Sequence, residues 1–237
     1  MALEDIQRNY EEIISRVDKQ ALASGRKFEE ITIVSVSKTH PIDFLLEGMK
    51  VGIKIFGENY VQELKEKYDY FVQNGITVPN FHYIGHLQRN KVKYISSFVD
   101  MIQSVDSLRL AEEISKQAEK NNRTIEILLQ INTSAELSKS GCEPELSSEL
   151  MGQIIELQHL KVSGVMAIGS FSEDETIFRK EFRMLKNIKD RLQKEYPKVL
   201  LKHISMGMTH DFEAAIEEGA TIVRIGTAIF GNRNYLK

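Results

Sequence analysis

The chain has 237 residues, of which 42% are hydrophobic and 27% are charged, and its net charge is −3. These fractions are ordinary for a globular protein, and they exclude a disordered chain, a collagen and a small scaffold built on disulfides. The balance of 31 basic and 34 acidic residues does not favour nucleic acid or an anionic membrane as a partner. The length fits one or two average domains, or one α/β barrel of about 250 residues.

Signals for export, membrane insertion and disulfide formation are weak. Cys142 has no second cysteine to pair with, which fits a reducing compartment and an incidental thiol. No stretch approaches the roughly eighteen apolar residues of a membrane-spanning helix. Residues 1–12 are acidic and amphipathic, unlike a secretory signal. We therefore expect a soluble, cytoplasmic protein.

Along the chain, strand-like and helix-like segments alternate. Apolar residues at helical spacing predict a helix over 3–22, which ends near Gly25. Short β-branched and aliphatic runs then predict strands at 31–38, 53–57, 81–85, 101–105, 125–132, 162–169, 200–207 and 221–226. The helices expected between them begin after Pro41 and cover 59–73, 87–95, 108–120, 145–157, 178–194 and 211–219, and a last one starts near Thr227.

This alternation predicts the fold class. The strand segments are nearly continuous in Val, Ile and Leu, which is typical of parallel strands buried on both faces. Eight strand–helix units in one chain favour a closed (β/α)8 TIM barrel over an open, doubly wound sheet. No linker-like segment interrupts the series, so we expect residues 1–237 to form a single barrel domain with an extra N-terminal helix.

Two strand ends near the C-terminus suggest a phosphate site. Barrels commonly bind phosphate with the loops after strands seven and eight and with a helix N-terminus. Ser205 and Gly207 lie at the first of these ends, and Gly226 and Thr227 lie at the second. Each hydroxyl alone is equally well explained as a helix cap. The pair at neighbouring strand ends favours phosphate.

Two cations complete the candidate site. Lys38 ends the first strand, where burial would lower its pKa and make it a Schiff-base nucleophile; the alternative is a lysine that extends to solvent. Arg224 interrupts the last apolar strand. If it points inward it needs a buried partner, and if it points outward an ion pair with a helix carboxylate would explain it.

The motifs around these residues resemble the pyridoxal phosphate homeostasis protein family, the single-domain relatives of the N-terminal barrel of alanine racemase. The resemblance extends over almost the whole chain, in VSVSKTHP (34–41), FGENYVQE (56–63), HYIGHLQRNK (82–91), INTSAELSKSG (131–141), GVMAIG (164–169), HISMGMTHDFEAAI (203–216) and VRIGTAIFG (223–231). Seven motifs in one order are specific, whereas no single one would be.

The resemblance implies a fold-type III barrel that holds pyridoxal 5′-phosphate (PLP) as an internal aldimine on Lys38. It assigns Arg224 to the pyridine nitrogen and Asn59 to the region of the ring and its 3′-oxygen. It also assigns the cofactor phosphate to Ser205, Gly226 and Thr227, with backbone help from Met206 and Gly207. Two residues depart from the usual family pattern, His86 after Gly85 and His210 in the loop near the phosphate; we expect His210 to be exposed.

The resemblance also implies a function. We expect PLP buffering or delivery to apo-enzymes that depend on PLP, by a monomer with little or no turnover, because the racemase's second, tyrosine-bearing domain is not found in the sequence. The alternative is a fold-type III racemase or decarboxylase, with His82, Tyr83 or His86 as the acid or base. A third alternative is a cofactor-free aldolase that uses Lys38.

Other constellations carry little signal. The six histidines are dispersed, and His82 and His86 lack the spacing of a helical metal site, so no metal site is expected. Arg89, Lys91 and Lys93 form a basic cluster, which is more typical of a solvated helix face than of a nucleic-acid interface.

Overall fold

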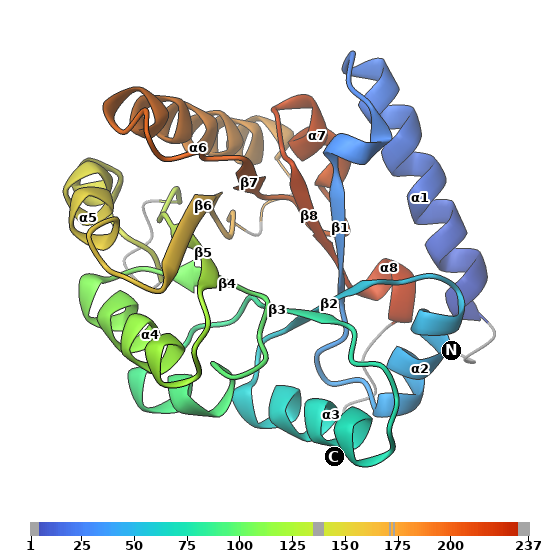
Figure 1. The fold of residues 1–237 in the computed structure, drawn as a ribbon. Helices are drawn as coiled ribbons and strands as arrows, with labels where there is room; N and C mark the ends of the chain where they lie inside the picture. The colour runs from blue at the N-terminus through green and yellow to red at the C-terminus, as the bar shows by residue number, and fades with distance from the viewer. Residues whose placement is uncertain (1–4, 135–139, 171, 173, 232–237) are drawn as a thin grey trace.

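Short aliphatic runs form the eight strands of a closed barrel (Figure 1). The computed structural model describes residues 5–134, 140–170, 172 and 174–231. All neighbouring strands are parallel and follow one another in chain order, so the predicted barrel is confirmed and the open sheet is wrong. The strands are β1 (Thr32–Val36), β2 (Ile55–Glu58), β3 (Asn80–Tyr83), β4 (Met101–Val105), β5 (Ile125–Gln130), β6 (Leu160–Met166), β7 (His203–Ser205) and β8 (Ile222–Ile225).

The first and last strands close the ring. β1 pairs with β8 in a register that places Val34 opposite Arg224 and Ser35 opposite Ile225. Because the strands are parallel, their carboxyl ends all meet at the same end of the barrel. The residues that follow β1 and β8 are therefore neighbours at that end, although almost 190 residues separate them (38 to 226 in the chain numbering).

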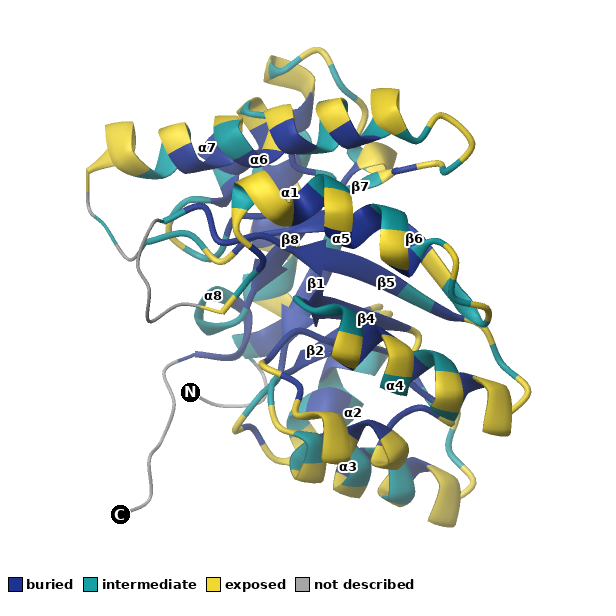
Figure 2. Ribbon diagram, turned by 90° about the vertical axis from the view of Figure 1, so that its left-hand side faces the viewer, coloured by how far each residue is buried: buried dark blue, intermediate teal, exposed yellow. Residues whose placement is uncertain are grey.

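Helices cover the outside of the barrel, and Figure 2 shows exposed residues on their outer faces and buried residues along the strands. The expected N-terminal helix is α1 (Asp5–Ala23), which packs its buried Ile6, Ile13 and Val17 face against the last two helices. The others are α2 (Ile42–Lys50), α3 (Val61–Gln73), α4 (Leu108–Lys120), α5 (Ser147–Ile154), α6 (Glu175–Glu195), α7 (Phe212–Glu217) and α8 (Thr227–Phe230). None of the helices in the described part of the chain combines the length and apolar composition needed to cross a membrane.

The segment after β3 differs from the sequence prediction. A helix over 87–95 was expected, but the structure has a short 3-10 helix, η2 (Arg89–Tyr94). Its buried apolar residues are Leu87, Val92 and Ile95, whose spacing of five and three does not repeat at the period of an α-helix. The basic cluster is exposed here, with the Lys91 and Lys93 amines 5.7 and 5.0 Å from the centroid of the Tyr94 ring.

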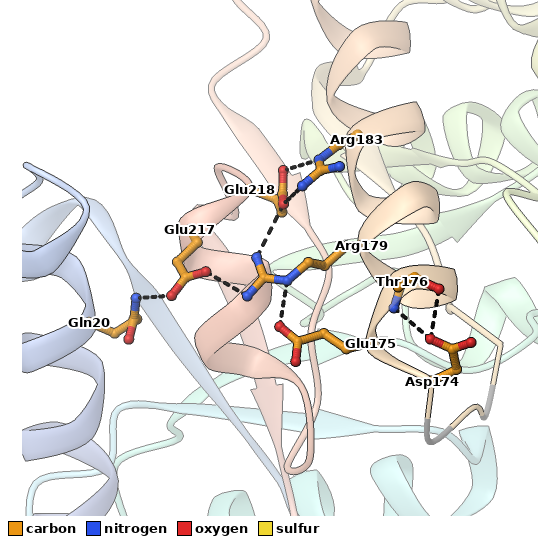
Figure 3. Close-up of polar contacts among 8 residues, drawn as sticks. All are labelled: Gln20, Asp174, Glu175, Thr176, Arg179, Arg183, Glu217 and Glu218. Carbon is orange, nitrogen blue, oxygen red and sulfur yellow. Dashed lines mark hydrogen bonds and ion pairs between the residues drawn. The ribbon is translucent and has the colours of Figure 1, made fainter.

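A surface ionic network ties three helices together beside β8 (Figure 3). The Arg179 guanidinium of α6 lies 2.6 Å from Glu217 and 3.2 Å from Glu218, at the C-terminal end of α7. Arg183 adds a second ion pair to Glu218 at 2.8 Å, and Gln20 of α1 donates to Glu217 at 2.7 Å. This network links α6 and α1 to the C-terminal end of α7, the helix between β7 and β8.

Candidate functional site

A cavity of about 270 Å³ opens at the carboxyl ends of the strands. It is close to the lower limit of typical small-molecule sites, roughly 300 Å³. Its lining comes from β1 and β8 and from the segments after β1, β2, β3, β6, β7 and β8, and consists of Val36, Lys38, Asn59, Ile84, Ile168, Met208, Thr209, His210, Arg224, Gly226 and Thr227. Five of the eight predicted site residues therefore share this cavity: Lys38, Asn59, Arg224, Gly226 and Thr227.

Lys38 occupies a tight turn two residues beyond the end of β1. The His40 N–H donates to the Ser37 carbonyl at 3.1 Å and closes the turn. Thr39 has a φ of +65°, a left-handed conformation that is uncommon for a β-branched residue. Lys38 is half-buried and lines the cavity, which differs from a lysine that simply extends into solvent.

Arg224 points into the barrel, which is the first of the two alternatives that the sequence left open. Only 5% of the residue is exposed. Its Nη1 donates to the Ser205 hydroxyl at 2.6 Å and its Nη2 donates to the Ala167 carbonyl at 2.8 Å. Burial lowers the pKa of this guanidinium to about 10, and the Asp211 carboxylate partly opposes the shift. At neutral pH the residue remains a cation on the cavity floor.

The hydrogen bonds behind Arg224 continue as a chain across the barrel interior. The Ser205 hydroxyl donates to Gln103 Oε1 at 2.6 Å, and Gln103 Nε2 lies 3.0 Å from His82 Nδ1. Arginine can only donate, so each following group accepts from one neighbour and donates to the next. His82 Nδ1 is then the acceptor at the end. Burial lowers the His82 pKa to about 4, and the neutral imidazole is the form that the chain requires.

The loops after β7 and β8 bring two hydroxyls together. Thr227 Oγ1 donates to Thr209 Oγ1 at 3.2 Å, and both residues line the cavity. Thr227 is the first residue of α8, where backbone N–H groups have no partner within the helix. Gly226 lies against β1, because a Cβ on it would meet the Val36 carbonyl oxygen at 3.2 Å. Hydroxyls and helix-initial N–H groups are suited to an anion.

Ser205, Met206 and Gly207 do not line the cavity. The Ser205 hydroxyl is buried and bonded to Arg224 and Gln103, and the Met206 N–H donates to the Ile222 carbonyl at 3.1 Å. Gly207 has a φ of +88°, and a Cβ there would approach the Ala215 Cβ to 2.5 Å. These residues shape the turn behind the cavity.

Thr209 was not among the predicted site residues. Thr209 lies two residues after Gly207, in a loop held by the Met208 N–H, which donates to Asp211 Oδ1 at 2.6 Å. The signal was the second hydroxyl residue of SMGMT (205–209), which lies four positions after Ser205. His210 also lines the cavity and is exposed, as expected.

Asn59 presents an unsatisfied polar atom to this region. Its Oδ1 is buried and has no hydrogen-bond partner among the described residues. Its backbone carbonyl accepts from the Tyr83 hydroxyl at 2.9 Å. Gly85 packs directly against this carbonyl, since a Cβ on Gly85 would approach it to 2.3 Å. A buried amide without a partner is unfavourable unless a ligand supplies one.

The three proposed acid or base residues near β3 lie elsewhere. His82 is buried in the hydrogen-bond chain, and burial raises the pKa of Tyr83 to about 12. His86 lines a different cavity of about 630 Å³, with its Nδ1 4.0 Å from Asp106. None of them is among the residues that line the Lys38 cavity.

Within the described ranges, no group of three or more His, Cys, Asp or Glu side chains is arranged to hold a metal ion. Burial raises the pKa of the Cys142 thiol to about 11, so it is protonated at neutral pH. The chemistry of the site therefore rests on Lys38, Arg224, Asn59 and the two threonines.

A parallel eight-stranded barrel with a lysine, a buried arginine and a pair of threonine hydroxyls around one cavity at its carboxyl end fits a class of protein, the alanine racemase-like barrels. The family model described as "Alanine racemase, N-terminal domain" matches residues 2–234. A relative from Aquifex aeolicus, a "Pyridoxal phosphate homeostasis protein", is 44% identical over 223 residues, which are 94% of this chain and 96% of the relative. The chain belongs to the pyridoxal phosphate homeostasis protein family, within this wider class.

Solved structures agree with that assignment. PipY of Synechococcus elongatus, whose structure was solved with PLP bound, is 31% identical and has a TM-score of 0.79 over 85% of this chain and 93% of that chain. Alanine racemase from Corynebacterium glutamicum has a TM-score of 0.70 at 13% identity, over 97% of this chain and 62% of that chain. At that identity the racemase supports the fold alone.

Proposed function

We propose that this protein binds pyridoxal 5′-phosphate in the cavity at the strand ends and acts in PLP homeostasis, as a buffer or carrier of the cofactor. One observation carries the proposal: Lys38, Arg224 and the Thr209–Thr227 pair line a single cavity. The chain's relatives bear the name of this function, and PipY was solved with PLP.

The residues present fit this cofactor. PLP is an aldehyde, a pyridine ring with a 3′-oxygen, and a phosphate. Lys38 offers an amine, Arg224 a donor toward the ring nitrogen, and Asn59 an amide whose buried oxygen has no protein partner among the described residues. When bound, the aldehyde condenses with an amine to give a carbon–nitrogen double bond and one water.

For the phosphate we propose Thr209 and Thr227, with the backbone at Gly226 and at the start of α8. The assignment of the phosphate to Ser205, Met206 and Gly207 stays a prediction, and their positions favour a supporting role. Replacing Thr209 and Thr227 together by valine should weaken PLP binding about a hundredfold, because two hydrogen bonds to a charged group are lost. Binding of pyridoxal, which lacks the phosphate, should stay unchanged; an equal loss for both compounds would contradict the assignment.

Lys38 is proposed as the point of covalent attachment. Titration of the purified protein with PLP should produce the absorbance of the bound chromophore, and borohydride reduction should fix the added mass on the Lys38 peptide. Lys38→Ala should abolish the attachment, whereas the exposed Lys93→Ala should not. A wild-type protein without the chromophore, or a Lys38→Ala variant that keeps a reducible attachment, would refute this proposal.

Low turnover is part of the same proposal. A positively charged guanidinium at the ring nitrogen disfavours protonation of that nitrogen and weakens the ring as an electron sink. His82, Tyr83 and His86 lie outside the cavity lining. The alternative, a racemase or decarboxylase, is favoured by one observation only, the position of His210 on the cavity. Fast incorporation of deuterium at an amino-acid Cα by the wild type, lost in His210→Asn, would support the enzyme.

Several further features are proposals about the chain as a whole. We expect one domain, a monomer in solution, a cytoplasmic location, and delivery of PLP to apo-enzymes. Eight strands in one closed barrel favour a single cooperative unit. Calorimetry and sedimentation test the first two expectations: two separate unfolding transitions, or a sedimenting dimer, would contradict them.

A further inference from the structure

The turn that carries Lys38 is held from behind by a buried lysine of α3. Lys67 Nζ donates to the Ser37 carbonyl at 2.8 Å, to Glu58 Oε1 at 2.6 Å and to Glu63 Oε1 at 2.7 Å. The Lys67 side chain is only 6% exposed. An ammonium group has three protons, so all of its donors are used in these contacts.

The two carboxylates also bind the turn directly. Glu58 Oε1 accepts from the Ser37 hydroxyl at 2.6 Å, and Glu63 Oε1 accepts from the Thr39 N–H at 2.6 Å. The residues on both sides of Lys38 are therefore attached to one cluster, which we call the Lys67 cluster: Glu58, Glu63 and Lys67. The contact at Thr39 falls on the residue whose left-handed conformation is the strained part of the turn.

Stability alone does not explain the cluster, because burying its charged groups costs free energy. Glu58 is fully buried, and its Oε2 has no hydrogen-bond partner in the described part of the chain. Burial raises the pKa of its carboxyl to about 7, even though the Lys67 ammonium opposes this. Buried ion pairs are often no more stabilising than apolar side chains of the same volume. What apolar side chains could not provide is the set of polar contacts with Ser37 and Thr39.

We propose that Lys67, together with Glu58 and Glu63, is a positioning group for Lys38, which fixes the turn so that the Lys38 amine meets the cofactor aldehyde in the cavity. This inference rests on the proposed function, because it assigns the cluster a task in the covalent attachment of PLP. Positioned groups react with effective concentrations far above those of free ones, so a loosened turn lowers attachment more than it lowers binding.

Lys67→Met tests the positioning role with two compounds. The first is PLP, whose covalent attachment is followed by absorbance and by borohydride trapping at Lys38. The second is pyridoxine 5′-phosphate, which has the ring and the phosphate but no aldehyde. We expect the rate of PLP attachment to fall about tenfold or more, while the affinity for pyridoxine 5′-phosphate stays within about twofold of wild type. Lys67→Arg, which keeps the charge and the donors, should restore part of the attachment rate.

The matched control is Lys65→Met on the same helix, since Lys65 pairs with Asp69 and not with the turn. It should leave both measurements unchanged. If Lys67→Met does not fold, the double variant Glu58→Gln/Lys67→Met removes a buried carboxylate together with its cation and carries the same test. Unchanged attachment, or equal losses for both compounds, overturns the positioning role. A wild-type protein that binds neither compound refutes the proposed function instead.

Discussion

The two walls of the cavity are supported in opposite ways. The Lys38 wall rests on charged groups, with one lysine between two carboxylates, buried behind the backbone of the turn. The Arg224 wall rests on uncharged groups, a hydroxyl, an amide and an imidazole in sequence behind the guanidinium. A charged support holds strongly and fails severely when one partner is lost, because the others remain buried and unpaired. A chain of neutral hydrogen bonds loses less stability when one member is replaced. The effect of a replacement on Arg224 also becomes smaller with each hydrogen bond that separates the two residues.

This difference matches what each wall must do. The turn at Lys38 is strained at Thr39, so its support has to oppose a conformational preference. Arg224 needs only a fixed direction, since its charge is already retained at neutral pH. Neutral partners hold that direction without cancelling the positive charge that faces the cavity.

The largest effect on stability is expected at the charged wall. Lys67→Met leaves two carboxylates around an apolar side chain, and the free energy of unfolding should fall by about 3 kcal/mol. Urea denaturation at neutral pH measures it, with Lys65→Met as the control, because the more exposed Lys65–Asp69 pair should contribute under about 1 kcal/mol. Equal losses in the two variants would remove the contrast between buried and surface charge.

The same wall should give stability a pH dependence. The folded pKa of Glu58, about 7, lies above its ordinary value of 4.5, so the folded state favours the protonated carboxyl. Its contribution to stability is therefore largest below about pH 4.5 and is lost as the pH rises through 7.

The variant Glu58→Gln, which cannot ionise, isolates this contribution. Its stability relative to wild type should increase between about pH 5 and 7 and level off above that range in parallel urea titrations. A relative stability that stays flat over this range would show that Glu58 remains ionised throughout, as in an ordinary ion pair.

At the neutral wall the expected effects are smaller and graded. Ser205→Ala removes a contact with Arg224 itself and should weaken PLP binding about fivefold, near the value of one hydrogen bond. Gln103→Met removes the next link and should weaken it about twofold. Ser163→Ala is the control, because Ser163 is as buried as Ser205 but takes no part in the hydrogen bonds that lead from Arg224 to His82; it should leave PLP affinity unchanged. A larger effect for Gln103→Met than for Ser205→Ala would contradict the idea that Gln103 affects Arg224 only by way of its hydrogen bond with Ser205.

The smallest effect is expected for charges far from both walls. Glu218→Gln breaks the ion pairs with Arg179 and Arg183 in the surface network of Figure 3. Stability should fall by under about 1 kcal/mol, and added salt should reduce the difference, because exposed pairs are screened. PLP affinity should not change. A loss of stability as large as that of Lys67→Met would mean that burial does not make the Lys67 cluster more important for stability than the surface network.

The fold was predictable because its signal is local. Eight aliphatic runs at regular intervals require a parallel sheet covered by helices, and the structure has the closed barrel. The exception is the segment after β3, where Leu87, Val92 and Ile95 do not follow the period of an α-helix. Its 3-10 geometry depends on what those three side chains pack against.

The cavity was predictable only in part. Lys38, Arg224 and Thr227 stand out as polar residues at the ends of apolar strands, and the structure brings them together. Ser205 was placed at the end of its strand, and it is the last residue of β7, but its buried hydroxyl is bonded to Arg224 and Gln103 and does not line the cavity. The Lys67 cluster left no local signal, since Lys67 reaches a carbonyl thirty positions earlier in the chain. Only the packing of α3 against the β1 turn reveals that contact.

The pairing of β1 with β8 has a consequence for the order of events during synthesis. Val34 and Arg224 face each other across the seam of the ring, so one half of the cavity is made early and the other half last. A nascent chain with seven strands has Lys38 but lacks Arg224, Gly226 and Thr227. If the proposed site is correct, we expect PLP binding to arise only when the ring closes, because Arg224, Gly226 and Thr227 enter the cavity with the last strand.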